Sequence, residues 1–364
     1  MTRIIEDTKL DYSDVLLVPR ASEIHSRSQV DLLSEFCGGE GIPIIASNMD
    51  NVGTFQMAEA LAKHKLYTCL NKHYSVEDLV NFYTDSANAD IIPYTIYSMG
   101  ANLDDLAKFD QVQDLIEQRE GDMEAQSEPM MVCIDVANGY SKLLEDFIKH
   151  FNEKYPTRYI IAGNICTPER VFSLINAGAD YVKIGVGPGS VCTTRIKTGV
   201  GYPQFSAVLE CADAARRAHG QVIADGGCTS PGDVAKAFAA GASAVMLGGM
   251  LAGHDEGYSP EQLGKVWNRA RGVHEKYNPV ASLPFYGMAS KTAQDKHNGG
   301  VKDYRSSEGK EVSVPYRGPV EYTILDILGG LRSSMSYCDA VDLDEFQKNA
   351  QFCKVNNQVN RVFG

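Results

Sequence analysis

The 364-residue chain lacks any run of about 18 consecutive apolar residues, which is the length that a membrane-spanning helix requires. It also lacks the basic start and apolar core of a secretory signal, because acidic residues are scattered through residues 1–19. These two absences predict a protein that does not span a membrane and that is located in the cytoplasm.

Positive charge is scarce as well. The chain has 34 Lys and Arg against 47 Asp and Glu, a formal net charge of −13. An acidic protein binds nucleic-acid backbone and anionic membrane surfaces poorly. We therefore expect no polynucleotide partner and no membrane partner, although a local cationic pocket could still bind the phosphate of a mononucleotide.

Paired cysteines are absent. The nine cysteines are an odd number and form no C-x-x-C motif, which argues against a zinc ribbon or a dithiol redox site. Most lie in apolar surroundings, as Cys69 and Cys133 do. We expect eight of the nine to be buried free thiols of a reducing compartment, with Cys192 as the exception.

Short, continuous apolar runs recur along the chain. Runs of this kind, without polar alternation, are typical of strands buried on both faces. They predict eight strands, at 42–46, 67–70, 94–98, 131–135, 159–162, 181–184, 222–224 and 244–247. Amphipathic stretches between them predict helices, most clearly at 55–63, 76–83, 141–151, 168–177, 206–218 and 231–240. Alternating strands and helices indicate a parallel sheet, and eight repeats indicate an α/β fold of the (β/α)8 TIM-barrel type.

Two of the predicted helices have the same boundary residues. Thr167 and Ser230 each precede a proline and are predicted N-caps, while Gly178 and Gly241 end the helices. The surplus length predicts one barrel domain over 1–364 with an N-terminal arm (1–40), an inserted lid after the eighth strand (252–318) and a C-terminal tail (337–364). A polar, solvent-exposed excursion is the alternative to the lid.

A glycine-rich loop follows the sixth predicted strand and reads GVGPGSVCTTR from Gly185 to Arg195. It is a poor dinucleotide fingerprint, because such loops open a helix directly. It does place Cys192 at the end of the barrel where such folds bind their substrates. Arg195 lies three residues further on, and a nearby cation favours the nucleophilic thiolate. The alternative is a structural thiol.

Polar residues and paired glycines follow other predicted strands. Asp225-Gly226-Gly227 and Gly248-Gly249 follow the seventh and eighth strands, where barrels commonly bind a phosphate through backbone amides. Asp225 is then placed to accept hydrogen bonds from ribose hydroxyls. Asp135 and the Asn48-Met49-Asp50 segment follow two other strands, either as helix caps or as ligand contacts.

Taken together, these residues resemble the inosine-monophosphate dehydrogenase and guanosine-monophosphate reductase superfamily. The resemblance runs from DYSDVLL at Asp11 to Ser333, and within the superfamily it is closest to the reductase branch. The stretches that carry it are IGVGPGSVCTTRIKTGVGYPQFSA from Ile184, DGGCTSPGDVAKAFAAGASAVMLGG from Asp225 and YRSSEGK from Tyr304. Too few residues separate Lys72 from Tyr94 for the regulatory modules that the dehydrogenases usually insert.

For a reductase, the resemblance implies a covalent mechanism. Cys192 would attack C2 of the guanine of GMP, and ammonia would leave to give a thioimidate. NADPH would then deliver hydride to C2, and the thiolate would leave to release IMP. Thr194 and Glu308 match the pair that supplies the proton to the departing amine, and a glutamine in place of Glu308, which is usual in the dehydrogenases, could not titrate.

The resemblance also implies the binding residues and a homotetramer. Those for GMP would be Ser190, Asp225, Gly226, Gly227, Gly248, Gly249, Gly287, Met288, Ala289, Arg305, Ser306, Ser307 and Gly309. Those for NADPH would be Ser26, Arg27, Lys72, Asp135, Val136, Ala137, Val186, Gly187, Met288, Tyr304, Ser333, Ser334, Met335 and Ser336, with Arg27 and Lys72 suited to its 2′-phosphate. A potassium ion would lie at Gly187, Gly189, Cys192 and Arg195.

Two other functions remain open from the sequence. One is an IMP dehydrogenase that lacks the regulatory modules and oxidises IMP to XMP with NAD. The other is a catalytically inactive nucleotide sensor on the same barrel, although every proposed catalytic group is present.

Overall fold

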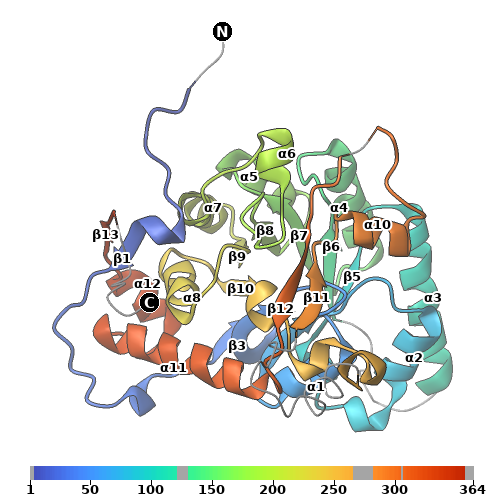
Figure 1. Cartoon of the computed structure of the whole chain (residues 1–364), viewed down its shortest axis with the longest axis horizontal. Helices are drawn as coiled ribbons and strands as arrows, with labels where there is room; N and C mark the ends of the chain where they lie inside the picture. Colours follow the sequence, from blue (N-terminus) through green and yellow to red (C-terminus); the bar gives the residue numbers. More distant parts are fainter. Residues whose placement is uncertain (1–3, 121–129, 265–281, 305, 357–364) are drawn as a thin grey trace, which may run out of the picture.

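The computed structural model describes residues 4–120, 130–264, 282–304 and 306–356. Eight parallel strands follow one another around a closed barrel, because the last strand pairs with the first through Val245 and Ile44 (Figure 1). They are β3 (Gly39–Ala46), β4 (Leu66–Cys69), β5 (Thr95–Met99), β6 (Met131–Asp135), β7 (Tyr159–Ile165), β8 (Tyr181–Ile184), β9 (Gln221–Asp225) and β10 (Ala244–Leu247). The predicted TIM barrel is confirmed, with every predicted strand in place.

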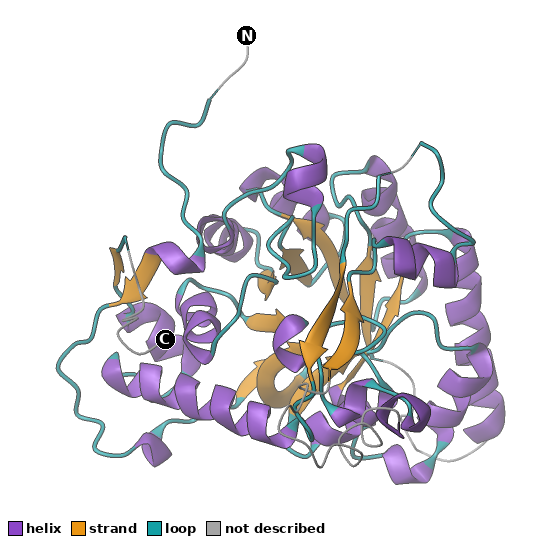
Figure 2. Ribbon diagram, in the orientation of Figure 1, coloured by secondary structure: helices purple, strands orange, loops and turns teal. Residues whose placement is uncertain are grey.

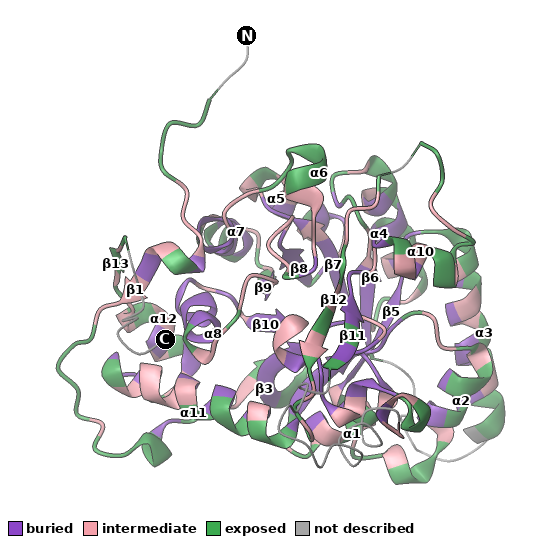
Figure 3. Cartoon of the chain, viewed as in Figure 1, coloured by how far each residue is buried: buried purple, intermediate pink, exposed green. Residues whose placement is uncertain are grey.

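The strands form where apolar side chains can be buried on both faces of the sheet. β4, β5, β8 and β10 are buried at every position, as Figure 3 shows for the centre of the molecule. Helices surround the barrel (Figure 2) and are α1 (Phe55–Ala62), α2 (Val76–Thr84), α3 (Leu103–Glu120), α4 (Lys142–Lys154), α5 (Pro168–Asn176), α7 (Gln204–Arg217), α8 (Pro231–Ala239) and α11 (Glu321–Tyr337). Burial of their apolar faces against the strands supplies most of the stability of such a fold.

The helix boundaries agree with the sequence in most details. Ser230 caps α8 by accepting the Asp233 N–H at 3.3 Å. Gly178 and Gly241 have φ values of +114° and +104°, which an L-residue with a side chain rarely adopts. Thr167 occupies the predicted N-cap position of α5, but its side chain makes no capping bond, since its hydroxyl accepts the Tyr140 hydroxyl at 3.0 Å instead.

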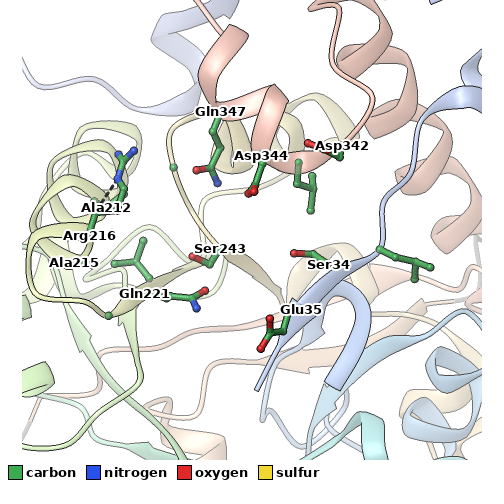
Figure 4. Close-up of a pocket in the computed structure, with 15 residues that line it drawn as sticks. Ser34, Glu35, Ala212, Ala215, Arg216, Gln221, Ser243, Asp342, Asp344 and Gln347 are labelled. Carbon is green, nitrogen blue, oxygen red and sulfur yellow. Dashed lines mark hydrogen bonds between the residues drawn. The ribbon is translucent and has the colours of Figure 1, made fainter. Parts of the chain in front are cut away.

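One end of the barrel is closed. The short strand β2 (Ser34–Phe36) folds back on β3, and the Phe36 ring lies 4.7 Å from the rings of Tyr67 and Tyr181. A cavity of about 520 Å³ lies at this amino-terminal end, between the starts of β9 and β10 and helix α12 (Leu343–Asn349) (Figure 4). None of the predicted site residues lines this cavity. The predicted catalytic residues lie at the opposite end of the barrel, where the strands have their carboxyl ends.

The region predicted as a lid, residues 252–318 and called the lid region below, contains regular structure in its described part. β11 (Ser282–Tyr286) and β12 (Glu311–Pro315) form an antiparallel pair, and α10 (Lys291–His297) lies between them in sequence. This pair crosses the barrel in Figure 1. The tail contributes α12 and β13 (Phe352–Lys354), which pairs with β1 (Val15–Leu17) of the N-terminal arm. No helix among the described residues is long and apolar enough to cross a membrane.

The expectation of eight buried thiols is mostly correct. Six cysteines are buried, namely Cys37, Cys69, Cys133, Cys166, Cys211 and Cys338, and all nine are free. Cys228 is only half-buried, and the prediction for Cys353 was wrong. Cys353 is exposed because it lies on β13 of a two-stranded sheet at the surface.

Candidate active site

Three predicted catalytic side chains meet at the open end of the barrel. The Sγ atom of Cys192 lies 3.2 Å from Oγ1 of Thr194, which donates to Oε2 of Glu308 at 2.8 Å. Cys192 and Thr194 follow β8, whereas Glu308 comes from the lid region 114 residues further along the chain. The fold therefore forms a continuous path for a proton from the thiol through a hydroxyl to a carboxyl group.

Backbone pairing brings Glu308 to this position. Its carbonyl accepts the N–H of Thr193 at 2.9 Å, and the next residues, Gly309 and Lys310, pair with Cys192 and Val191. Gly309 also forms a bridge with Ser290 on its other side. The segment around Glu308 thus lies between the cysteine loop and the start of α10, and single backbone bridges at Gly309 hold it on both sides.

The predicted phosphate-binding residues lie beside the same loop. A Cβ atom on Gly249 would lie 2.5 Å from Oγ of Ser190, so the glycine backbone lies directly against this side chain. Gly226 lies against Pro188 and Gly189, and Gly287 faces the Val191 carbonyl. The ends of β9 and β10 and the lid therefore surround the loop that carries Cys192.

Asp225 and Asp135 share a buried lysine that was not predicted as a site residue. Nζ of Lys183 lies 2.5 Å from Oδ1 of Asp135 and 3.3 Å from Oδ2 of Asp225. Burial opposes the charged lysine, but the two carboxylates outweigh it and raise the pKa of Lys183, and Lys183 in turn lowers the pKa of Asp135. The signal in the sequence is a lysine inside the apolar strand Tyr181–Ile184, where an unpaired charge would be costly.

Asn164 completes this arrangement. Its amide donates to Oδ2 of Asp225 at 2.8 Å and to the carbonyl of Gly185 at 3.0 Å. The predicted ribose contact therefore has its orientation fixed from two sides before any ligand binds.

Arg195 does not contact the thiol in the way that the sequence suggested. Its Nη1 lies 3.2 Å from Oδ2 of Asp11, and its Nη2 donates to the Tyr202 carbonyl at 2.5 Å. The guanidinium therefore links the cysteine loop to the N-terminal arm, and among the hydrogen bonds of the described residues the Cys192 thiol pairs with Thr194 instead.

The predicted potassium ligands lie on this loop. The carbonyls of Gly189 and Arg195 each accept one backbone N–H, from Cys192 and Gly199 respectively. A carbonyl oxygen has a second lone pair, so both can still bind a cation. Oxygen donors of this kind suit a hard monovalent ion.

The predicted cofactor residues fall into two groups. One group lies at the open end: Asp135 is the last residue of β6, and the residues that follow β4, β6 and β8 are Lys72, Val136, Ala137, Val186 and Gly187. Arg27, in the short helix η2 (Arg27–Gln29), lies against α11, which also carries Ser333–Ser336, on the outer side of the barrel (Figure 1). Met335 is fully buried in the core, so its side chain is not available to a cofactor.

The remaining predicted residues lie in the lid. The Ser307 hydroxyl lies 3.1 Å from the Gly309 carbonyl and 3.4 Å from the Ala289 carbonyl and can donate to either one, which places the two lid segments side by side. Ser306 is exposed, and Tyr304 is 84% exposed. Arg305 lies outside the described residues.

Comparison with known proteins gives one consistent family. The model of the IMP dehydrogenase / GMP reductase domain matches residues 9–361. The chain is 50% identical to a GMP reductase of Citrobacter koseri over 99% of both chains, and 48% identical to GMP reductase 1 of Homo sapiens over 100% of both. It is 47% identical to a GMP reductase of Phytophthora infestans, over 100% of this chain and 95% of that protein. The chain therefore belongs to the IMP dehydrogenase / GMP reductase family.

Proposed function

We propose that this protein is an NADPH-dependent GMP reductase, which converts GMP to IMP and ammonia. The observation that carries the proposal is the contact series Cys192–Thr194–Glu308, in a chain about half identical to proteins named GMP reductase. A carboxyl group at position 308 supports the reductase over an IMP dehydrogenase, because it can give up and take back a proton where an amide could not.

The proton path serves the first half of the reaction. Glu308 accepts the thiol proton of Cys192 through the Thr194 hydroxyl, which leaves a thiolate to attack C2 of the guanine. The same path then returns that one proton to the amino group on C2 as the C–N bond breaks, so that the NH2 group leaves as NH3. Ammonia leaves, and C2 remains bonded to Sγ of Cys192 as a thioimidate.

The second half needs a hydride, which NADPH supplies to C2. The C2–Sγ bond then breaks, and Cys192 departs as a thiolate, ready for the next GMP. Water would have to be excluded from this carbon, because a water molecule there would hydrolyse the thioimidate.

The binding residues that we propose are those implied by the sequence, without the buried side chain of Met335. Ser190 and the backbone amides of Gly248, Gly249 and Gly287 would bind the GMP phosphate, and Asp225 the ribose. Lys72 and Arg27 would pair with the 2′-phosphate of NADPH. The carbonyls of Gly187, Gly189 and Cys192, with Arg195, would bind a potassium ion.

We also propose that the chain is a single cytoplasmic barrel unit that assembles as a homotetramer. The position of Arg27 and Ser333–Ser336 on the outer side of the barrel supports this assembly. A neighbouring copy that presents these residues to the open end would unite the two groups of cofactor residues in one site.

A product assay tests the function. GMP with NADPH should consume NADPH and release one ammonia for each NADPH oxidised. Cys192→Ser should abolish turnover, and mass spectrometry should find a purine adduct on the wild-type cysteine. Turnover only with IMP and NAD would identify a dehydrogenase, and nucleotide binding without any turnover would identify a sensor; either result overturns the proposal.

A further inference from the structure

A buried carboxylate at the end of β3 holds the lid at two places. The Asp50 side chain is only 4% exposed. Its Oδ2 atom accepts the Tyr286 hydroxyl at 2.8 Å, Nζ of Lys296 at 2.8 Å and Nε2 of His297 at 2.7 Å. Tyr286 is the last residue of β11 and His297 the last of α10, so one carboxylate fixes both ends of the segment 286–297.

This segment in turn holds Glu308. Gly287, next to Tyr286, donates its N–H to the Lys310 carbonyl at 3.2 Å. Ser290, which caps α10, forms a bridge with Gly309. A short series of backbone contacts therefore links Asp50 to the residue that follows Glu308 in the chain.

We propose that Asp50 is a positioning residue that holds Glu308 against Thr194, by fixing the lid segment 286–297 to the end of β3. The inference rests on the proposed role of Glu308 in ammonia release. Asp50 itself lies on the lid side of the site and touches Tyr286, Lys296 and His297 rather than the cysteine loop. It acts only through the backbone pairing of residues 287–290 with 309–310.

The electrostatics suit a permanent contact. Burial disfavours the ionised form of Asp50, but the hydrogen bonds from Lys296, His297 and Tyr286 outweigh it and lower the pKa of this carboxyl. Charge-assisted hydrogen bonds to a largely buried carboxylate are stronger than those between neutral groups. The contact therefore persists at neutral pH without any ligand.

A metal ion is the competing explanation for this cluster. Asp50, His73 and His297 offer ligand atoms that lie within 4.8 Å of one another. The rings of His73 and His297 are stacked with centroids 3.5 Å apart and planes 5° from parallel, so their in-plane lone pairs run side by side instead of converging on one point. The ammonium of Lys296 beside Asp50 also opposes a divalent cation.

The test compares Asp50→Ala and Asp50→Asn with a matched control, Asp255→Asn. Asp255 accepts the Tyr316 hydroxyl at 2.7 Å, next to the end of β12. Both carboxylates thus bind a tyrosine at an end of the β11–β12 pair, but only Asp50 also holds the segment that pairs with Gly309. Asp50→Asn keeps the side-chain volume if the alanine variant does not fold.

Hydrogen exchange gives a readout that needs no activity. The amides of Thr193 and Lys310, which bond to Glu308 and Val191, should exchange faster in the Asp50 variants and at the wild-type rate in Asp255→Asn. Unchanged exchange in the Asp50 variants overturns the proposal. A second result would also overturn the proposal. If Zn²⁺ slowed the exchange of these amides in the wild type but not in His73→Ala, the cluster would be a metal site.

Kinetics then test the dependence on Glu308. Asp50→Asn should lower kcat by about tenfold or more with a smaller change in KM for GMP. In a Glu308→Gln background the same substitution should cost less than about twofold, because both changes act on one step. If Asp50→Asn lowered kcat by the same factor in the wild type and in the Glu308→Gln background, the two residues would act independently and the positioning role would be overturned. A wild-type protein that does not turn over GMP would overturn the proposed function alone, and the exchange experiment would still decide the role of Asp50.

Discussion

Glu308 is the residue on which the chemistry depends most. Glu308→Gln keeps the hydrogen bond to Thr194 but removes a group that can transfer a proton, so kcat for ammonia release should fall by about a hundredfold or more. Rapid-quench measurement of ammonia checks this. Glu311→Gln is the matched control, because Glu311 also accepts a threonine hydroxyl, from Thr292, outside the path to Cys192. Equal activity of the Glu308 variant and the wild type would remove the proton-transfer argument.

His73 should make stability depend on pH. Burial, with the neighbouring His297, lowers the pKa of His73 from the ordinary value of 6.5 to about 4. Between these values the unfolded chain binds the proton more readily than the folded one, so the free energy of unfolding should fall as pH drops from 6.5 toward 4. Denaturant titrations across this range should show a shallower pH slope for His73→Gln. The exposed His150 serves as the control, and an unchanged slope in His73→Gln would contradict the prediction.

Individual residues differed in how far the sequence could predict them. Cys192 was predicted from a local pattern, because a thiol on a glycine-rich loop after a strand needs no distant partner. Glu308 came only from the family resemblance, since nothing near it in sequence shows that it meets Thr194. Lys183 and the role of Asp50 were missed because their partners lie 42 to 247 residues away.

The start of a helix can also depend on a residue that is far away in the sequence, as helix α7 shows. Helix α7 has no capping side chain of its own, because Pro203 occupies its N-cap position. Asp11 from the N-terminal arm supplies the cap instead, since its Oδ1 accepts the Gln204 N–H at 2.6 Å while its Oδ2 pairs with Arg195. Asp11→Ala should therefore lower the free energy of unfolding by about 1 kcal/mol.

Chemical denaturation measures that loss, and the activity of the same variant shows whether the cysteine loop also loosens. Asp14→Ala is the control, because the Asp14 carboxylate accepts the backbone N–H of Asp11 within the arm, and no hydrogen bond given for the described residues joins this carboxylate to α7 or to Arg195. A larger loss of stability in Asp14→Ala than in Asp11→Ala would contradict the capping role.

Strands made of continuous apolar runs could be predicted from the sequence, whereas the strands of the lid region could not. Strands such as β5 and β8 are short apolar runs that can only be buried, so their bounds agree with the sequence within a residue or two. Strand β12 reads Glu-Val-Ser-Val-Pro and alternates between exposed and half-buried positions, so its composition looks like that of a polar loop. It is a strand because β11 lies beside it, which no local pattern reveals.

At the scale of the whole molecule, the proposed tetramer makes a measurable prediction. Sedimentation equilibrium should give a mass close to four times that of the 39.8 kDa chain. If the cofactor site is shared between copies, mixing and reassociating Arg27→Ala and Cys192→Ser proteins should restore activity, because a hybrid contains one site with both native residues. A fully active monomer would contradict both the assembly and the shared site.

The pairing of β1 with β13 has a consequence for how the chain can be cut and rejoined. Leu16 lies opposite Cys353, so the two arms of the polypeptide come together on one side of the barrel. The barrel itself is cyclic, because β10 pairs with β3. A circular permutant that joins the arms by a linker and opens the chain at the loop before β5 would keep every strand pair. The strand pairing around the barrel is therefore closed although the polypeptide is linear. A chain with a different order of strands in its gene could form the same strand pairs.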